Sequence, residues 1–202
     1  LMCGIAGQVK FKGVINEGNI SAMDEAIKHR GPDGSGLYIN EAKTAALGHR
    51  RLSFLDLSET GKQPMTQEDG SMWVTFNGEI YNYLELRLEL EKCGHRFHSH
   101  TDTEVILHGY EQWGADVVNK MKGMFAFAVW DEKRKELFLA RDRFGIKPLY
   151  YYYEDGNFVF ASEIKAIKAN ADVSTSLDYS SFADFFVYRY IPSPKSIWKE
   201  VK

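Results

Sequence analysis

Four consecutive runs in the second half of the sequence are typical of β-strands, and they constrain the fold more than any other feature. They are rich in aromatic and aliphatic residues, and polar turns separate them, such as EKRK at 132–135 and Asp155-Gly156-Asn157. The runs are MFAFAVWD (124–131), ELFLARDR (136–143), PLYYYYED (148–155) and FVFASE (158–163). Hairpins of this kind place neighbouring strands antiparallel, whereas a doubly wound parallel sheet needs a crossover helix between strands. The sequence therefore predicts an antiparallel α+β architecture.

The rest of the chain predicts further strands and helices in mixed order. Strand patterns occupy 3–9, 36–40, 44–56 and 71–76, the last closed by Asn77-Gly78. Helices are predicted at 21–31, between an N-cap at Ser21 and a stop at Gly31, at 83–94, and from a capping box at Thr101 and Glu104 to about Trp113. In the second helix LELRLELE alternates like a strand, but its residues are strong helix formers.

Length and composition place the chain among soluble globular proteins of the cytoplasm. Its 202 residues suit one domain with a short tail, and a net charge of −3 gives no basic field for nucleic acid or an anionic membrane. Cys3 and Cys93 are too few for a disulfide framework, which favours a reducing compartment. We find no signal peptide and no apolar run long enough to span a membrane.

Cys3 stands almost at the N-terminus, where an α-amine on the same residue could activate its thiol. Removal of the residues before it would leave a free α-amine on the same residue, with a reference pKa of about 7.7–8.0. That amine can act as the general base that activates the thiol. The alternative is an ordinary buried core cysteine.

Asn77-Gly78 offers two adjacent N–H donors that could stabilise an oxyanion. From the sequence alone a plain hairpin turn is the better explanation of Asn-Gly, although the segment that follows resembles a helix rather than a returning strand.

Charged residues could hold the two ends of an amino-acid substrate. Arg30, Arg50 and Arg51 are candidates for a carboxylate, and Asp102 for an ammonium group. Taken singly, each is better explained as a solvated arginine or as a carboxylate at a helix N-terminus.

A cysteine and three histidines lie together between Cys93 and His100. Their spacing matches none of the usual zinc-ligand pairs, and His98 and His100 would share one face of a short strand. We expect no metal site there.

Several segments, in order along nearly the whole chain, resemble class II glutamine amidotransferase domains, and most of all the N-terminal glutaminase domain of asparagine synthetases. They are MCGIAG (2–7), HRGPDGSG (29–36), GHRRLSFLD (48–56), FNGEIYNY (76–83), TDTEVI (101–106), GMFAFAVWD (123–131) and ARDRFGIKPLYY (140–151).

The resemblance implies the fold of N-terminal nucleophile hydrolases, an αββα sandwich of two antiparallel sheets between helical layers. It implies that Cys3 is the nucleophile, that Asn77 and Gly78 form the oxyanion hole, and that Arg51 and Asp102 hold the carboxylate and ammonium of glutamine. By motif, Leu52, Ser53, Phe54, Leu55 and Glu79 line the glutamine pocket, and Arg30 and Asp33 support the nucleophile.

The implied reaction is hydrolysis of L-glutamine through a Cys3 thioester, with no cofactor or metal in this domain. In such enzymes ATP and Mg²⁺ serve a C-terminal synthetase domain, and neither an SGGxDS-type loop nor a Walker motif occurs here. We expect the glutaminase domain at 3–175 and the start of the connection to the synthetase domain at 176–202. The sequence leaves the oligomeric state open, and a homodimer is one alternative.

Two other functions stay open at this stage. One is an amidotransferase of the same type with another acceptor, such as an amino sugar or a surface polysaccharide. The other is a catalytically silent regulatory domain. We also expect that the chain is inactive while Leu1 and Met2 precede Cys3, because the Cys3 nitrogen is then an amide.

Overall fold

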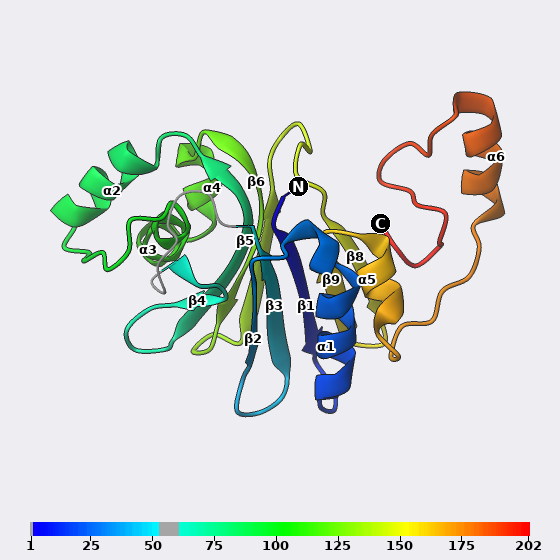
Figure 1. Cartoon of the computed structure of the whole chain (residues 1–202), viewed down its shortest axis with the longest axis horizontal. Helices are drawn as coiled ribbons and strands as arrows, with labels where there is room; N and C mark the ends of the chain where they lie inside the picture. The colour runs from blue at the N-terminus through cyan, green and yellow to red at the C-terminus, as the bar shows by residue number, and fades with distance from the viewer. Residues whose placement is uncertain (1, 53–60) are drawn as a thin grey trace.

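Two antiparallel sheets lie face to face in this computed structural model, which describes residues 2–52 and 61–202 (Figure 1). The first sheet has the order β2-β3-β1-β9-β8 and the second the order β4-β5-β6-β7. The strands of the first are β1 (Gly4–Lys10), β2 (Gly34–Ile39), β3 (Ala45–Arg51), β8 (Tyr150–Glu154) and β9 (Asn157–Ala161). Those of the second are β4 (Met65–Thr66), β5 (Met72–Ile80), β6 (Gly123–Asp131) and β7 (Glu136–Arg141).

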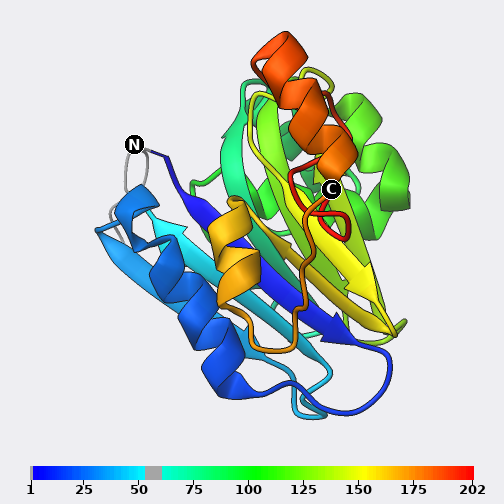
Figure 2. The same ribbon diagram turned by 90° about the vertical axis from the view of Figure 1, so that its right-hand side faces the viewer.

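Helices cover the outer face of each sheet, so that the molecule has four layers (Figures 1 and 2). On the first sheet lie α1 (Glu17–Ala26) and α5 (Ile164–Ala169). On the second lie α2 (Tyr83–Lys92), α3 (Thr103–Trp113) and α4 (Val117–Lys120). Short 3₁₀ turns occupy η1 (Lys28–Arg30) and η3 (Gly114–Asp116), and α6 (Tyr179–Tyr188) lies apart from the sandwich.

Three apolar cores fill the spaces between the four layers. The central core joins the sheets through residues such as Leu47, Trp130 and Phe160. One outer core packs α1 and α5 on the first sheet, and the other packs the helices α2 to α4 on the second. Strands β1, β3 and β6 therefore bury side chains on both faces. The predicted αββα sandwich is confirmed.

The first helix differs from its predicted bounds. It begins at Glu17 rather than after Ser21, because Asn16 Oδ1 accepts a hydrogen bond from Gly18 N at 2.9 Å and caps it. It ends at Ala26, and the 3₁₀ turn of η1 separates it from Gly31. An asparagine cap was overlooked because the apolar spacing is clearer after Ser21.

The prediction of a strand closed by Asn77-Gly78 is wrong. Strand β5 continues through both residues, which pair with Ala126 and Phe125 of β6. Asn-Gly after an alternating strand usually indicates a hairpin turn, and the sequence therefore predicted the end of the strand here.

The capping box predicted at Thr101 and Glu104 is also absent. The cap of α3 is Asp102, and the Glu104 carboxylate instead accepts hydrogen bonds from His98 N and Ser99 N, both at 2.8 Å. The α2 prediction is confirmed, since the helix ends at Lys92 and Gly94 follows with a positive φ of 98°.

The segment after residue 176 returns to the first sheet. Val201 pairs with Tyr152 of β8 and is fully buried among the side chains of the outer core. None of the helices in the described ranges is long and apolar enough to cross a bilayer.

Candidate active site

The ends of three strands meet at one edge of the sandwich and form a cavity of about 450 Å³. Cys3 directly precedes β1, Arg51 ends β3, and Asn77 and Gly78 lie in β5 of the other sheet. Register brings the first two together, because Gly4 is paired with Arg50. Residues 3, 51 and 77 are thus assembled by the pairing of β1 with β3 and the stacking of the two sheets.

Two polar contacts between the sheets fix β5 relative to β3. Thr75 Oγ1 donates to Gly48 O at 3.0 Å, and His49 Nε2 lies 3.1 Å from Phe76 O. Burial lowers the pKa of His49 to about 4, so its ring is neutral and its Nε2–H donates to that carbonyl. Because Phe76 precedes Asn77, these contacts hold Asn77 at the cavity.

The Cys3 thiol is held by the backbone of Leu52. Leu52 N donates to Cys3 Sγ at 3.3 Å, and Sγ lies 3.6 Å from Leu52 O. Burial raises the pKa of the thiol, and the Leu52 hydrogen bond and the Arg51 charge offset that rise only in part. The thiol therefore needs a base in order to react near neutral pH.

Asn77 places an unused donor in the wall of the cavity. Its side chain is only 1% exposed, and Nδ2 has no hydrogen-bond partner among the described residues. Buried amide groups without a partner are rare in folded proteins. This N–H group is therefore available to an oxygen atom of a ligand.

Gly78 is at a place where a side chain cannot fit. A Cβ atom there would lie 2.4 Å from Met124 O and 2.8 Å from Phe125 Cα. The backbone of β6 is therefore packed directly against this position of β5.

Asp102 lies on the same cavity and is nearly buried. Its Oδ2 accepts a hydrogen bond from Ile80 N at 2.9 Å, which fixes the carboxylate at the end of β5. Burial raises the pKa of Asp102 to about 6, and the nearby Glu79 charge adds to that rise. A cationic ligand group would offset this destabilisation of the charged form.

Arg30 contacts the residue that carries the thiol. Its Nε donates to Cys3 O at 3.0 Å, and its Nη1 pairs with Glu163 at 2.9 Å. Asp33 lies further out, where its backbone N donates to Arg51 O at 3.1 Å. Both residues brace the strands around Cys3 without lining the cavity.

Arg50 points away from the cavity. It pairs with Asp24 at 2.6 Å and with Glu25 at 2.7 Å, both on α1. Of the three arginines considered for a carboxylate, only Arg51 lines the cavity. Leu52 and Glu79 line it too, whereas Ser53, Phe54 and Leu55 lie outside the described residues.

Lys147 is buried in the cavity wall and was not predicted from the sequence. Its Nζ donates to Met2 Sδ at 3.0 Å, so the residue before Cys3 occupies the space in front of this ammonium. Asp142 positions the loop, because its carboxylate accepts from the backbone N–H of Ile146 and of Lys147. The sequence signal that could have indicated Lys147 is the order Asp142, Gly145, Lys147, in which an aspartate precedes a glycine turn and a single lysine.

Gln63 is a second missed residue of the cavity. Its Oε1 accepts from Phe76 N at 2.6 Å, and its Nε2 donates to Thr103 Oγ1 at 3.1 Å. It therefore joins β5 to the start of α3, next to Asp102. No motif marks it, since its partners are far apart in the sequence.

Two stacked antiparallel sheets, with a cysteine before the first strand and an unused N–H donor in one cavity, define the class of N-terminal nucleophile hydrolases. Solved structures agree with this fold. Glutamine phosphoribosylpyrophosphate amidotransferase from B. subtilis, complexed with ADP and GMP, superposes with a TM-score of 0.68 at 25% identity, over 83% of this chain and 43% of that one.

A family profile described as a glutamine amidotransferase domain matches residues 2–202, and the chain belongs to this family. A putative glutamine-hydrolysing asparagine synthetase 2 of Methanocaldococcus jannaschii is 43% identical over 98% of this chain. Glutamine-hydrolysing asparagine synthetase 3 of Bacillus subtilis is 43% identical over 92%. The chain spans only 41% and 30% of the lengths of these relatives.

Proposed function

We propose that the chain hydrolyses the side-chain amide of L-glutamine to glutamate and ammonia, with Cys3 as the nucleophile. The observation that carries the proposal is the unpartnered Nδ2 of Asn77, because it lies in the wall of the cavity that also holds the Cys3 thiol. A nucleophile and an unused buried donor in one cavity are the two parts that acyl transfer requires.

Catalysis begins with the free α-amine of Cys3. The amine takes the thiol proton, Sγ attacks the amide carbon, and the carbonyl π electrons move to oxygen. The Asn77 side chain and the Gly78 backbone N–H stabilise this oxyanion. When the carbon–nitrogen bond breaks, the proton returns from the Cys3 ammonium to the leaving nitrogen, and ammonia departs. Water then attacks the thioester, which releases glutamate and restores the thiol.

The ends of the substrate are bound by opposite charges. Asp102 receives the α-ammonium, and Arg51 binds the α-carboxylate, with Leu52 and Glu79 beside them in the cavity wall. Arg30 acts as a positioning residue through its hydrogen bond to Cys3 O. No step requires a cofactor.

The ammonia would serve ATP- and Mg²⁺-dependent asparagine synthesis on a C-terminal domain. Three observations support this partner, and the first two are the names of the relatives and their length relative to this chain. A third is an apolar face on α6 and the residues after it, where Phe182, Phe185, Phe186, Tyr188 and Tyr190 are exposed. An uncovered face of this kind marks a protein contact.

A diazo-ketone analogue of glutamine tests the site directly. We expect it to alkylate a form of the protein that begins at Cys3, at Cys3 alone, and excess glutamine to prevent the reaction. Cys93→Ser is the matched control, because Cys93 is the other cysteine, is exposed and lies outside the cavity. Intact-mass and peptide analysis that finds no modification of Cys3 would contradict the proposal and favour a silent regulatory domain.

A further inference from the structure

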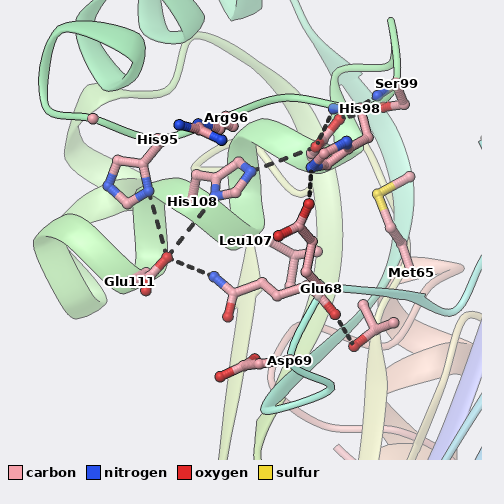
Figure 3. A pocket seen from close by; sticks show the side chains of 14 residues that line it. Met65, Glu68, Asp69, His95, Arg96, His98, Ser99, Leu107, His108 and Glu111 are labelled. Atoms are coloured by element: carbon pink, nitrogen blue, oxygen red, sulfur yellow. Dashed lines mark hydrogen bonds and ion pairs between the residues drawn. The ribbon is translucent and has the colours of Figure 1, made fainter.

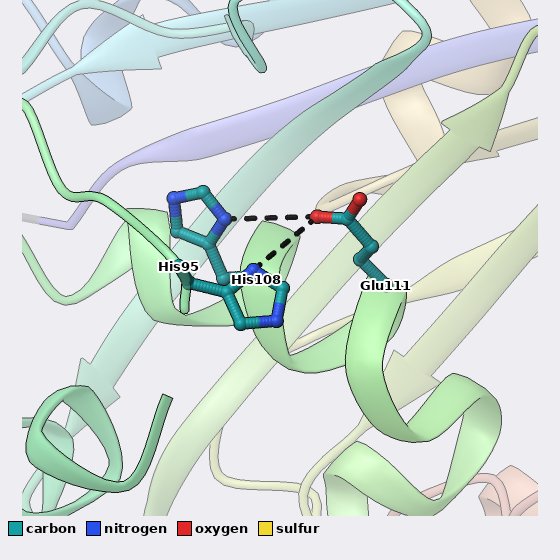
Figure 4. A group of neighbouring side chains, drawn as sticks. All are labelled: His95, His108 and Glu111. Atoms are coloured by element: carbon teal, nitrogen blue, oxygen red, sulfur yellow. Dashed lines mark ion pairs between the residues drawn. The ribbon is translucent and has the colours of Figure 1, made fainter. Parts of the chain in front are cut away.

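A second, larger cavity of about 730 Å³ lies between α3, the loop after α2 and the turn after β4 (Figure 3). Three side chains in its wall carry metal-binding atoms that converge. They are His95 in the loop after α2, and His108 and Glu111 one turn apart on α3. Their ligand atoms all lie within 4.8 Å of one another (Figure 4).

The distances among these atoms are close to those around a bound ion. Glu111 Oε2 lies 3.4 Å from His95 Nδ1 and 3.8 Å from His108 Nδ1. A tetrahedral zinc ion with bonds of about 2.0–2.1 Å separates its ligand atoms by roughly 3.3 Å. Two of the three separations are therefore close to those around a bound ion, and the third is within 4.8 Å.

The second nitrogen of each ring is already engaged. His95 Nε2 lies 3.0 Å from Gln112 Oε1, and His108 Nε2 lies 3.5 Å from Glu104 Oε1. Both partners are oxygen atoms that can accept from the ring, and an Nε2 that donates to its partner leaves Nδ1 to bind an ion. Histidine ligands of metals are oriented in this way by carbonyl and carboxylate groups behind them.

The Nδ1 atoms of both rings face the Glu111 carboxylate. His108 is only 12% exposed, and its Nδ1 is a buried polar atom without a hydrogen-bond partner among the described residues. A metal cation between these atoms would offset the negative charge of the carboxylate. Glu111 is also held in place, because Gln67 Nε2 donates to its Oε2 at 2.7 Å.

We propose that His95, His108 and Glu111 bind one divalent transition-metal ion of the Zn²⁺ class. Two imidazoles and one carboxylate suit such an ion better than Mg²⁺ or Ca²⁺, which take oxygen ligands. Water from the open cavity completes the coordination. The ion ties the loop after α2 to α3 and has a structural role, since none of its ligands lines the Cys3 cavity.

Sequence spacing did not reveal this site. The proposed site includes only His95 from the run between Cys93 and His100. Cys93 is exposed, and His98 pairs with Glu68 at 2.7 Å. The run is a loop rather than the predicted strand, and the other two ligands come from α3. The proposed ion departs from the expectation that this domain holds no metal.

Calorimetric titration with ZnCl₂ tests the proposal on chelator-treated protein. Cys3 and Cys93 are first changed to serine, so that no thiol competes for the ion. We expect one equivalent of Zn²⁺ to bind, the melting temperature to rise, and Co²⁺ to give the visible absorption of a tetrahedral site. Glu111→Gln and His95→Ala should each weaken binding roughly tenfold or more.

His98→Ala is the matched control, because His98 is an exposed histidine of the same cavity outside the cluster. It should leave Zn²⁺ affinity unchanged. Absence of stoichiometric binding, or binding that survives Glu111→Gln and His95→Ala, would overturn the proposal. Loss of binding in His98→Ala alone would do the same, because it would place the ion elsewhere.

Discussion

Asn77 contributes a single hydrogen-bond donor, and its removal should affect the transition state alone. Asn77→Ala should lower kcat for glutamine roughly 10²–10³-fold, because the oxyanion loses one of its two donors. KM should change little, since neither end of glutamine contacts this amide in the proposed mode. Steady-state glutamate release measures both constants.

Asn119→Ala is a suitable control for that experiment. Asn119 is an asparagine of α4 that bonds to Asp116 on the surface, outside the cavity. It should leave both constants unchanged. A kcat for Asn77→Ala equal to that of this control would remove Asn77 from the oxyanion hole.

Asp102 should control substrate affinity and its pH dependence. Its pKa is raised by burial to about 6, so the carboxylate takes up a proton as the pH falls through that value and loses its attraction for the ammonium of glutamine. KM should therefore rise below about pH 6 and level off above it.

Asp102→Asn should raise KM at pH 8 about 10- to 100-fold, since a hydrogen bond to a charged group contributes about 1.5–3 kcal/mol. It should also abolish the rise of KM near pH 6. Initial rates between pH 5 and about pH 8 measure both effects. A KM equal to that of the wild type in Asp102→Asn would show that the ammonium binds elsewhere.

At the scale of elements, the close pairing of β5 with β6 positions the proposed oxyanion donors Asn77 and Gly78. Gly78→Ala should lower the free energy of unfolding by about 1–3 kcal/mol, because the new Cβ would overlap the β6 backbone. Denaturant unfolding measures this loss. Gly34→Ala is the control, since a Cβ on this glycine of β2 would meet nothing closer than Arg51 Cβ at 3.8 Å. Equal free energies of unfolding for the two variants would show that β5 and β6 can move apart to admit a Cβ without loss of stability, which would contradict this prediction.

Elements with a strong repeating pattern were predictable from the sequence, whereas their ends and contacts were not. The aromatic and aliphatic runs between polar turns predicted β6 to β9, and helix formers predicted α2 against its alternation. The predicted turn at Asn77-Gly78 was wrong because pairing along β6 overrides a local turn preference. Lys147 and Gln63 were missed because only the folded chain brings loops distant in sequence to Cys3.

At the scale of the whole molecule, four layers place the thiol at an edge where both sheets contribute to one cavity. The hairpins predicted an antiparallel α+β architecture, and the αββα arrangement was predictable only from the resemblance. The site could be anticipated residue by residue only through motifs such as FNGEIYNY, since single residues such as Arg50 and Arg51 are indistinguishable by spacing. The structure separates these two arginines, because neighbouring residues of β3 point to opposite faces.

The central claim is that the Cys3 amine is the base of a Cys3-dependent glutaminase. The direct measurement compares glutamine hydrolysis by a form that begins at Cys3 with hydrolysis by a form that keeps Met2, at equal concentration. We expect turnover only from the first, because in the second the Cys3 nitrogen is an amide and Met2 lies at the cavity beside Lys147. Equal turnover by the two forms, or undiminished turnover after Cys3→Ser, would contradict this mechanism.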